Sequence, residues 1–208
     1  MSGRNPRRPA PRTGRAARVV RGLWLLGFGR ADGFDWFGND RDALLSSLAP
    51  PIGFIVVLGL MLLLQKPSLP VLCLLLLLFC IVLLQPVLAE LLARLWKRRS
   101  NWMRYATASA WSVWLVIPFY VPAMLFASVL LQFGVGRVNA SRGAALLLEA
   151  YFFWLHWFLA WKGLGINRLQ ALATVVILTA VFSALAFGLE PLLLTVTASV
   201  SAGLPRPG

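Results

Sequence analysis

Residues 142–168, RGAALLLEAYFFWLHWFLAWKGLGINR, show which kind of protein this chain is. The run is long enough for a membrane-crossing helix, and it carries the single histidine, His156, the carboxylate of Glu149 and three tryptophans. The rest of the chain consists largely of further apolar runs of helix length, with cationic residues between them. This pattern predicts several membrane-spanning helices.

The composition supports the same interpretation. Of the 208 residues, 59% are hydrophobic and only 13% are charged, and the mean hydropathy is +0.77. A soluble domain carries about 25% charged residues to cover its surface. The deficit lies in long uninterrupted apolar blocks, so we expect one all-α domain, a polytopic membrane helical bundle.

The formal net charge of +13 raises the question of nucleic-acid binding. The distribution of the charge argues against it, because arginine and lysine stand in the N-terminal tail and in short loops beside apolar runs. Such residues set topology and contact anionic lipid headgroups. The densest loop cluster, which we expect to contact membrane lipids, consists of Arg94, Lys97, Arg98, Arg99 and Arg104.

The first 43 residues divide into two segments. Residues 1–18 are rich in arginine and proline and predict a disordered cytoplasmic tail, because so few apolar groups cannot offset the ordering entropy. Residues 19–43 mix aromatic and charged side chains and predict a short amphipathic segment lying in the headgroup layer. We expect breaks in it at residues 32–33 and 38–40, where glycine, asparagine and aspartate gather.

A five-span membrane domain is predicted for residues 44–190, followed by a tail, 191–208. The spans are expected at about 44–64, 69–93, 105–132, 144–164 and 169–188. In the first, Pro50-Pro51 predicts either a kink or the true helix entry. The third is long enough to tilt or break, and its prolines free backbone carbonyls that Thr107, Ser109 and Ser112 could satisfy.

Glycine and proline mark the later helix ends. Gly163 and Gly165 predict the end of the fourth span. Glu190-Pro191 predicts the end of the fifth. The last residues are moderately apolar and rich in threonine and serine, and we expect them to lie on the membrane surface, with a re-entrant segment as the alternative.

The positions of lysine and arginine predict the topology. Sixteen of these 20 residues fall in the N-terminal segment, the loop after the second span and the loop after the fourth, and four fall on the other side. The excess places the N-terminus in the cytoplasm and, with five spans, the C-terminus outside. The composition, heavy in arginine, leucine and alanine, favours a bacterial inner membrane.

Glu149 and His156 are the first candidates for a functional site, since an ionisable group within a span is costly. Seven residues apart, they share one helix face but lie about 10 Å apart along the axis. A proton relay between them therefore needs a water or a residue of another helix. The structural alternative is a neutral His156 bonded to another helix, and a Glu149 that reaches the interface or Arg142.

Three further residues of the spans are candidates. Pro118 and Tyr120 lie in the third span, whose broken backbone resembles the helices that line transporter sites. Glu90 precedes Arg94 by four residues at the end of the second span, the spacing of a helix-surface ion pair. The pair suggests either a gate or an ordinary span end at which long side chains reach the headgroups.

No catalytic set is evident in the sequence. A single histidine cannot build a metal site of the usual His/Cys type, and phosphate-loop, HExxH and GxSxG motifs are absent. Cys73 and Cys80 stand too far apart on one helix to bridge each other. We therefore expect no cofactor, no metal and no enzymatic activity.

The order of segments resembles a known family. An aromatic amphipathic segment precedes five closely spaced spans; the third reads Tyr105-Ala-Thr-Ala to Pro118-Phe-Tyr, and the turn after the fourth reads Gly163-Leu-Gly-Ile-Asn-Arg168. Over about residues 20–190 this is similar to the Yip-domain family of five-span membrane proteins, in particular its bacterial members. The resemblance implies the fold; in eukaryotes the family is associated with vesicle trafficking and binds prenylated small GTPases.

Two functions remain open at this point. The first is a non-enzymatic membrane protein that acts through contacts with lipids, other membrane proteins or itself. The second is a small transporter or permease, acting alone or as an oligomer, that uses Glu149 and His156. The surroundings of these two side chains discriminate between them: a wet cleft shared with Tyr120 favours transport, and lipid or a dry helix contact favours the first.

Overall fold

The computed structural model describes residues 14–64 and 69–203, and within these ranges all regular structure is helical. The predicted all-α class is therefore confirmed. In chain order the elements are α1 Arg15–Gly27, η1 Ala31–Trp36, α2 Arg41–Leu63, α3 Leu69–Leu95, η2 Arg99–Asn101, α4 Trp102–Ser112, η3 Val113–Leu115, α5 Val116–Gln132, α6 Arg137–Leu164 and α7 Arg168–Gly203.

In the part of the chain that is described, five helical stretches are long and apolar enough to cross a membrane, as predicted. We therefore treat the chain as an integral membrane protein. Only 6 to 28% of the residues in the most apolar window of each stretch are buried within the chain, so the spans are largely lipid-facing. These stretches are Arg41–Leu63, Val71–Leu95, Arg99–Gln132, Arg137–Leu164 and Arg168–Leu185.

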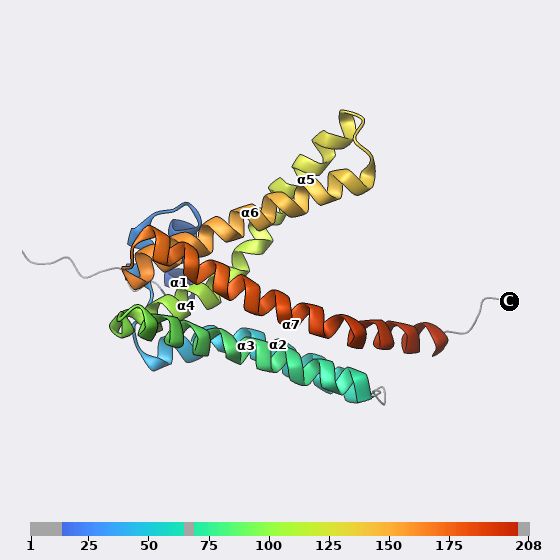
Figure 1. Cartoon of the computed structure of the whole chain (residues 1–208), viewed down its shortest axis with the longest axis horizontal. Coiled ribbons are helices and arrows are strands. Elements are labelled where there is room, and N and C mark those ends of the chain that lie inside the picture. The colour runs from blue at the N-terminus through green and yellow to red at the C-terminus, as the bar shows by residue number, and fades with distance from the viewer. Residues whose placement is uncertain (1–13, 65–68, 204–208) are drawn as a thin grey trace, which may run out of the picture.

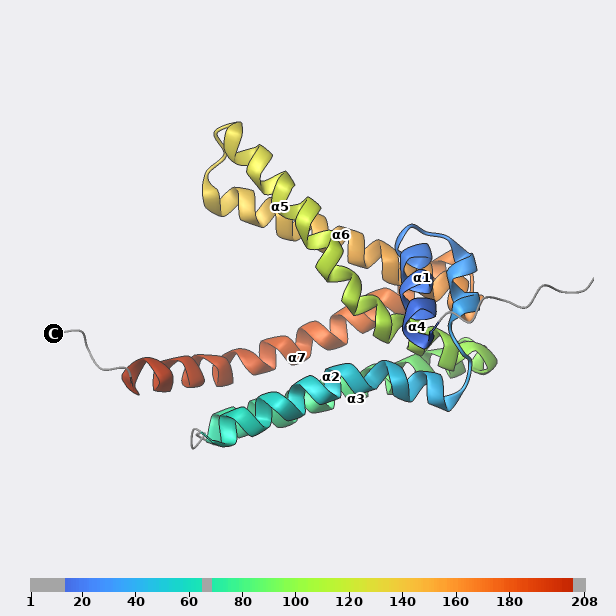
Figure 2. The ribbon, with the colours of Figure 1, turned by 180° about the vertical axis from the view of Figure 1, so that it is seen from behind.

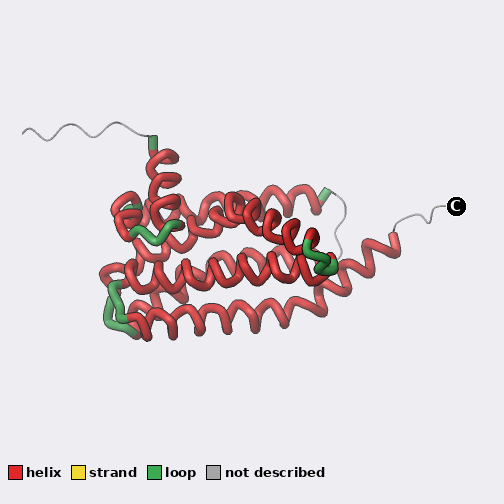
Figure 3. The backbone as a smooth tube through the Cα atoms, turned by 90° about the horizontal axis from the view of Figure 1, so that it is seen from above, coloured by secondary structure: helices red, strands yellow, loops and turns green. Residues whose placement is uncertain are grey.

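The helices meet at one end and diverge toward the other (Figure 1). The α5–α6 hairpin forms one arm, whereas α2, α3 and α7 form a second group, as the reverse view also shows (Figure 2). Seen from above, the long helices run side by side (Figure 3), so the divergence lies mainly in one plane. We call the meeting end, which carries Arg18, Arg98 and Arg168, the basic end.

The core lies at the basic end and is built around α4. Every residue from Tyr105 to Ala110 is buried, as is Ser112. Alanine, serine and threonine make up most of this stretch, and such small side chains allow α2, α3 and α6 to pack closely on α4. Larger apolar side chains, among them Leu155, Leu159 and Leu164 of α6, complete the core.

The N-terminal helix closes the basic end. In Figure 2, α1 runs across the direction of the spans, as a helix in the headgroup layer would. It packs on η1 so closely that a Cβ on Gly33 would lie 2.8 Å from the backbone oxygen of Gly22. Leu23 and Leu26 are buried against this contact, whereas Trp24 and Phe28 are exposed and stacked on each other.

Side-chain hydrogen bonds connect segments that are distant in the sequence. The indole of Trp96 donates to the Thr174 hydroxyl (3.0 Å), which connects the end of α3 to α7. The Tyr151 hydroxyl donates to the carbonyl oxygen of Gly27 (3.0 Å). This bond connects α6 to α1 and satisfies a carbonyl at the end of α1, where no helical amide follows to donate to it. Asn39 donates to the carbonyl of Ser100 and accepts from the amide of Arg104, so it connects two loops.

The turn from α6 to α7 follows the predicted glycine pattern. Gly165 ends α6 in the left-handed conformation (φ +67°), which favours glycine. The next helix is capped reciprocally: the Asn167 side chain accepts from the Gln170 amide, and the Gln170 side chain accepts from the Asn167 amide. Gly163, predicted as part of the helix end, lies inside α6.

The third span is broken rather than continuous over 105–132. A short 3-10 turn, η3, separates the buried α4 from α5. Pro118 stands in the first turn of α5 and has no amide to donate to the Trp114 carbonyl, which loosens the backbone at this point. The Ser112 hydroxyl donates to the Ser109 carbonyl (2.7 Å), which is not one of the carbonyls that the prolines free.

Three other boundaries differ from the prediction. Helix α1 begins at Arg15, so residues 15–18 are helical rather than part of a disordered tail; residues 1–13 lie outside the described part. The break expected at residues 32–33 falls instead at residues 28–30, where Gly29 has a φ of +74°. Pro50 and Pro51 lie inside α2 and do not mark its entry, because Asp40 caps the helix ten residues earlier.

The fifth helix also differs from the prediction, which ended it at Glu190-Pro191. It continues to Gly203, so residues 191–203 are helical; residues 204–208 are not described. One missing amide does not end a helix whose flanking residues continue the turn, and membrane helices tolerate proline for this reason. With 36 residues, α7 is about 54 Å long, which exceeds the roughly 30 Å of a hydrocarbon core.

Gly163 offers a test of how tightly the core is packed. A Cβ at this position would lie 2.9 Å from Cε1 of Phe34 and 3.4 Å from Cδ2 of Tyr105. We expect Gly163→Ala to lower the free energy of unfolding by about 1–3 kcal/mol. Gly53→Ala, where nothing lies within 4 Å, is the control and should raise it by up to about 1 kcal/mol. Equal melting temperatures of both variants in detergent would contradict this packing.

Candidate functional site

Glu149 lies on an exposed part of α6. Among the described residues, its carboxylate has no hydrogen-bond or ion-pair partner, and Arg142 is not bonded to it. It stands near the middle of α6 (Arg137–Leu164), on a face that the rest of the chain leaves uncovered. The geometry gives Glu149 no partner for proton transfer.

His156 is partly buried and satisfies one ring nitrogen on its own helix. Its Nδ1 lies 2.8 Å from the carbonyl oxygen of Phe152, one turn earlier. Because a carbonyl only accepts, Nδ1 carries the proton, and in the neutral ring Nε2 is left as an acceptor. The expected hydrogen bond to another helix is therefore replaced by a local one.

The α5–α6 contact fixes the relative depth of the candidates. Phe119 stacks on Tyr151 with ring centroids 4.0 Å apart. Counted along the helix axes from this stack, Tyr120 and Glu149 lie about 1.5 and 3 Å further from the basic end, and His156 lies about 7.5 Å nearer to it. Tyr120 is 52% exposed.

Among the described residues, no hydrogen bond or ion pair joins Tyr120, Glu149 and His156 to one another. Pro118 affects the backbone of the third span, because it has no amide to donate to the Trp114 carbonyl. An apolar groove of about 370 Å³ does lie between α6 and α7, but neither Glu149 nor His156 lines it. Its walls are Phe153, Trp154, Trp157, Arg168, Leu169 and Leu172.

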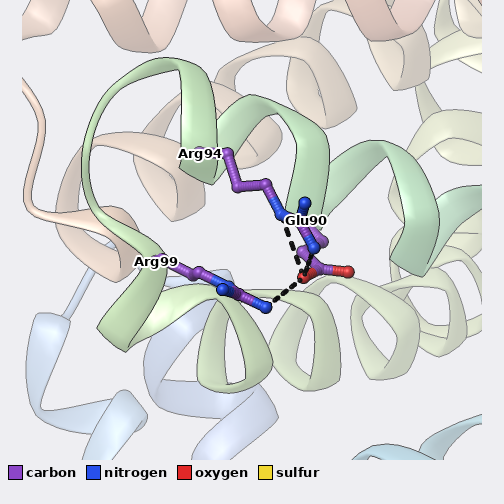
Figure 4. Close-up of polar contacts among 3 residues, drawn as sticks. All are labelled: Glu90, Arg94 and Arg99. Atoms are coloured by element: carbon purple, nitrogen blue, oxygen red, sulfur yellow. Dashed lines mark hydrogen bonds and ion pairs between the residues drawn. The ribbon is translucent and has the colours of Figure 1, made fainter.

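Glu90 is the candidate that the structure does surround with charge (Figure 4). Its Oε1 accepts from Nη2 of Arg94 at 2.6 Å and from Nη2 of Arg99 at 3.2 Å. The Arg94 contact is the predicted pair at i, i+4, and Arg94 adds a second bond from Nε at 3.1 Å. Arg99 comes from η2, beyond the end of α3, so the cluster joins this helix to the following loop.

Four cations around this cluster form an exposed surface that we call the basic rim, consisting of Arg94, Lys97, Arg98 and Arg99. Lys97 has a φ of +56°, and the amide of Arg98 donates to the carbonyl of Ala93 (2.7 Å), which ends α3 in a left-handed turn. The turn keeps the four cations within six residues of the chain at the end of α3, where Glu90 joins two of them, Arg94 and Arg99.

Arg104, the fifth cation expected to contact lipid, differs from the other four. It is only partly exposed, and its guanidinium lies 5.8 Å from the centroid of the Phe34 ring. Its Nε is buried without a hydrogen-bond partner in the described structure. Arg104 therefore belongs to the packing of η1 on α4 rather than to the basic rim.

A second cationic feature was not predicted. Lys162 Nζ lies 3.8 Å from the centroid of the Trp161 ring, and the Arg168 guanidinium lies 4.7 Å from it. Trp161 also stacks on Trp157, whose indole donates to the Arg168 carbonyl. Trp157 and Trp161 thus stack at the basic end, and cation–π attraction holds two cations on Trp161.

In the described residues, no group of three or more His, Cys, Asp or Glu side chains is placed to hold a metal ion. Both cysteines are free and exposed. Comparison with known proteins adds no assignment, since no family model, no curated protein and no solved structure matches the chain. The resemblance to the Yip-domain family remains a prediction.

Tyr105 provides a second test of the core. Its ring is 1% exposed, and its hydroxyl is buried without a partner in the described structure. An unpaired buried hydroxyl costs about 1–3 kcal/mol, so Tyr105→Phe should leave the free energy of unfolding unchanged or raise it. Tyr105→Ala is the control for lost packing and should lower it by about 3–5 kcal/mol. A clear loss of stability in the phenylalanine variant would show that the hydroxyl has a partner.

Proposed function

We propose that this is a non-enzymatic integral membrane protein that acts through contacts with anionic lipid headgroups and other membrane proteins at its basic end. The basic rim is the observation that carries the proposal. Four exposed cations lie within six residues of the chain, and Glu90 is the one carboxylate that pairs with any of them in the described residues. Two of the four, Lys97 and Arg98, form no ion pair in the described residues, so both are free to bind an anionic partner.

The rest of the architecture supports a role in contacts. The chain is packed at the basic end, and its spans diverge into two groups with largely lipid-facing surfaces. Its polar intramembrane groups are satisfied locally or exposed, and His156 lies about 10 Å along the helix axis from Glu149. Helices that pack together at one end and leave their other surfaces uncovered are suited to lateral association with lipids or membrane proteins.

Orientation and compartment belong to the same proposal. The basic rim, α1 and the α6–α7 turn lie at one end (Figure 1), and the cationic excess at that end favours the cytoplasmic side. The C-terminus would then lie outside. A bacterial inner membrane, with anionic lipids in its cytoplasmic leaflet, supplies the partner that the rim requires. A Yip-like fold is consistent with the five spans but stays an expectation.

Exchange of two rim cations tests the lipid contact. In nanodiscs of mixed anionic and zwitterionic lipid, we expect Lys97→Gln/Arg98→Gln to reduce the enrichment of anionic lipid around the protein. At about 1 kcal/mol per charge, the loss should be roughly 30-fold. The control is Arg137→Gln/Arg142→Gln, which removes two exposed cations at the opposite end and should change little. If both double variants changed the bound lipid equally, the basic rim would not be the surface that enriches anionic lipid.

Transport is the competing function, and it has a direct test. Because no hydrogen bond or ion pair joins Glu149, His156 and Tyr120 in the described residues, we expect reconstituted wild-type protein to give proton and solute fluxes at the level of empty liposomes. His156→Ala should give the same level. A wild-type flux that His156→Ala abolishes would establish the transporter instead.

A further inference from the structure

A small cavity of about 190 Å³ lies at the basic end, where four segments meet: α1, the residues after η1, the first turns of α2, and α4. Both charged and aromatic side chains line it. Its most informative walls are Arg18, Trp36, Asp40, Ser46, Thr107 and Trp111. The volume is below the 300 Å³ or more of pockets for drug-sized ligands, so the cavity fits a small polar group.

Thr107 lines the cavity and carries a buried hydroxyl that lacks a partner among the described residues. The residue as a whole is 1% exposed. A buried hydroxyl without a partner is costly, and a group in the cavity that this residue lines would satisfy it. The other hydroxyl in the wall, on Ser46, already donates to the Ala43 carbonyl at 2.7 Å but can still accept.

The charges in the wall are of both signs. Asp40 uses Oδ1 to accept from the Ala43 amide at 2.7 Å, and its Oδ2 has no partner in the described residues. Arg18 is exposed at the edge of the cavity and forms no ion pair within the described part of the chain. One free carboxylate oxygen and one free guanidinium complement a zwitterion better than an ion of either sign.

The place of the cavity in the fold suggests the source of the zwitterion. The helix α1 lies across the spans as a headgroup-layer helix would, and α2 continues from the cavity with exposed apolar side chains such as Leu45 and Phe54. A ligand with a polar end in the cavity and an apolar remainder along α2 is therefore favoured. Membrane phospholipids have this form.

We propose that the cavity binds the phosphoethanolamine headgroup of a membrane phospholipid. The phosphate lies against Arg18 and accepts a hydrogen bond from the Thr107 hydroxyl. The ammonium group donates to the free oxygen of Asp40. Choline carries no N–H donor and is bulkier, so the site selects the primary amine. The site is separate from the basic rim and concerns a zwitterionic lipid, so it goes beyond the function proposed above.

The test compares full-length protein and its variants in nanodiscs that contain equal amounts of phosphatidylethanolamine and phosphatidylcholine. Lipid that remains bound after extraction is identified by mass spectrometry. Wild-type protein should retain the ethanolamine lipid about tenfold over the choline lipid, as expected for charge-assisted hydrogen bonds. Asp40→Asn keeps the oxygen that caps α2 but removes the charge, and it should abolish this preference.

Two further variants separate recognition from folding. Thr107→Val removes the hydroxyl at nearly constant shape; it should reduce the preference several-fold while the melting temperature stays equal or rises, because an unpaired polar group is lost. Asp42→Asn is the matched control. Asp42 is an exposed acid in the first turn of α2 that does not line the cavity, and its variant should behave as wild type.

Each other outcome overturns the proposal. Equal retention of the two lipids by wild type, or an equal loss in Asp42→Asn, excludes a selective headgroup site. If Thr107→Val raises the melting temperature without changing the bound lipid, the cavity holds water only. Soluble phosphoethanolamine in a parallel arm should not compete with the lipid; its binding in the absence of lipid selectivity would exclude the membrane as the source. The test of the basic rim is independent of these outcomes: if Lys97→Gln/Arg98→Gln left anionic lipid unchanged, the proposal for the rim would fail and the headgroup site would not be affected.

Discussion

The burial of α4 is the constraint on which the rest of the structure depends. Among the described helices, this segment of small residues is the one in which every residue over a long run, from Tyr105 to Ala110, is buried, and α2, α3 and α6 all pack on it. Since lipid is as apolar as leucine, helices in a membrane gain little from burying apolar surface against one another. Close contact therefore concentrates where alanine, serine and threonine allow it, and the leucine-rich parts of the spans are left to diverge.

The polar groups follow the same division. At the basic end, Glu90 pairs with two arginines, Thr174 binds an indole, and Asn39 connects two loops. Farther along the spans, His156 donates to the Phe152 carbonyl of its own helix, and Glu149 is exposed. Water and headgroups are available at a membrane surface but not in the hydrocarbon, where an unmet polar group is expensive. The hydrogen bonds and ion pairs between distant segments of the described chain accordingly gather at the basic end.

Much of the fold was predictable, because it depends on local properties. The number of spans follows from apolar length, the end of α6 from Gly165, and the Glu90–Arg94 pair from helical spacing. Boundaries were less predictable where neighbours compensate for a local signal. Proline at 191 did not end α7, and prolines at 50 and 51 did not begin α2, because the flanking turns continue the helix. Arg104 was predicted as one of five loop cations that contact lipid. Its guanidinium instead lies over the ring of Phe34, a residue 70 positions earlier in the sequence, and such a long-range contact could not be predicted locally.

Local properties of the chain suffice to predict a five-span helical membrane protein with most of its positive charge at one end. Those properties require only that each segment be long, apolar or cationic. Tertiary structure alone decided that α4 forms the core, that His156 and Glu149 stay apart, and that Thr107 and Asp40 meet around one cavity. Such features arise when side chains from several helices share a depth and a face. That register is set by close packing, and no single segment encodes it.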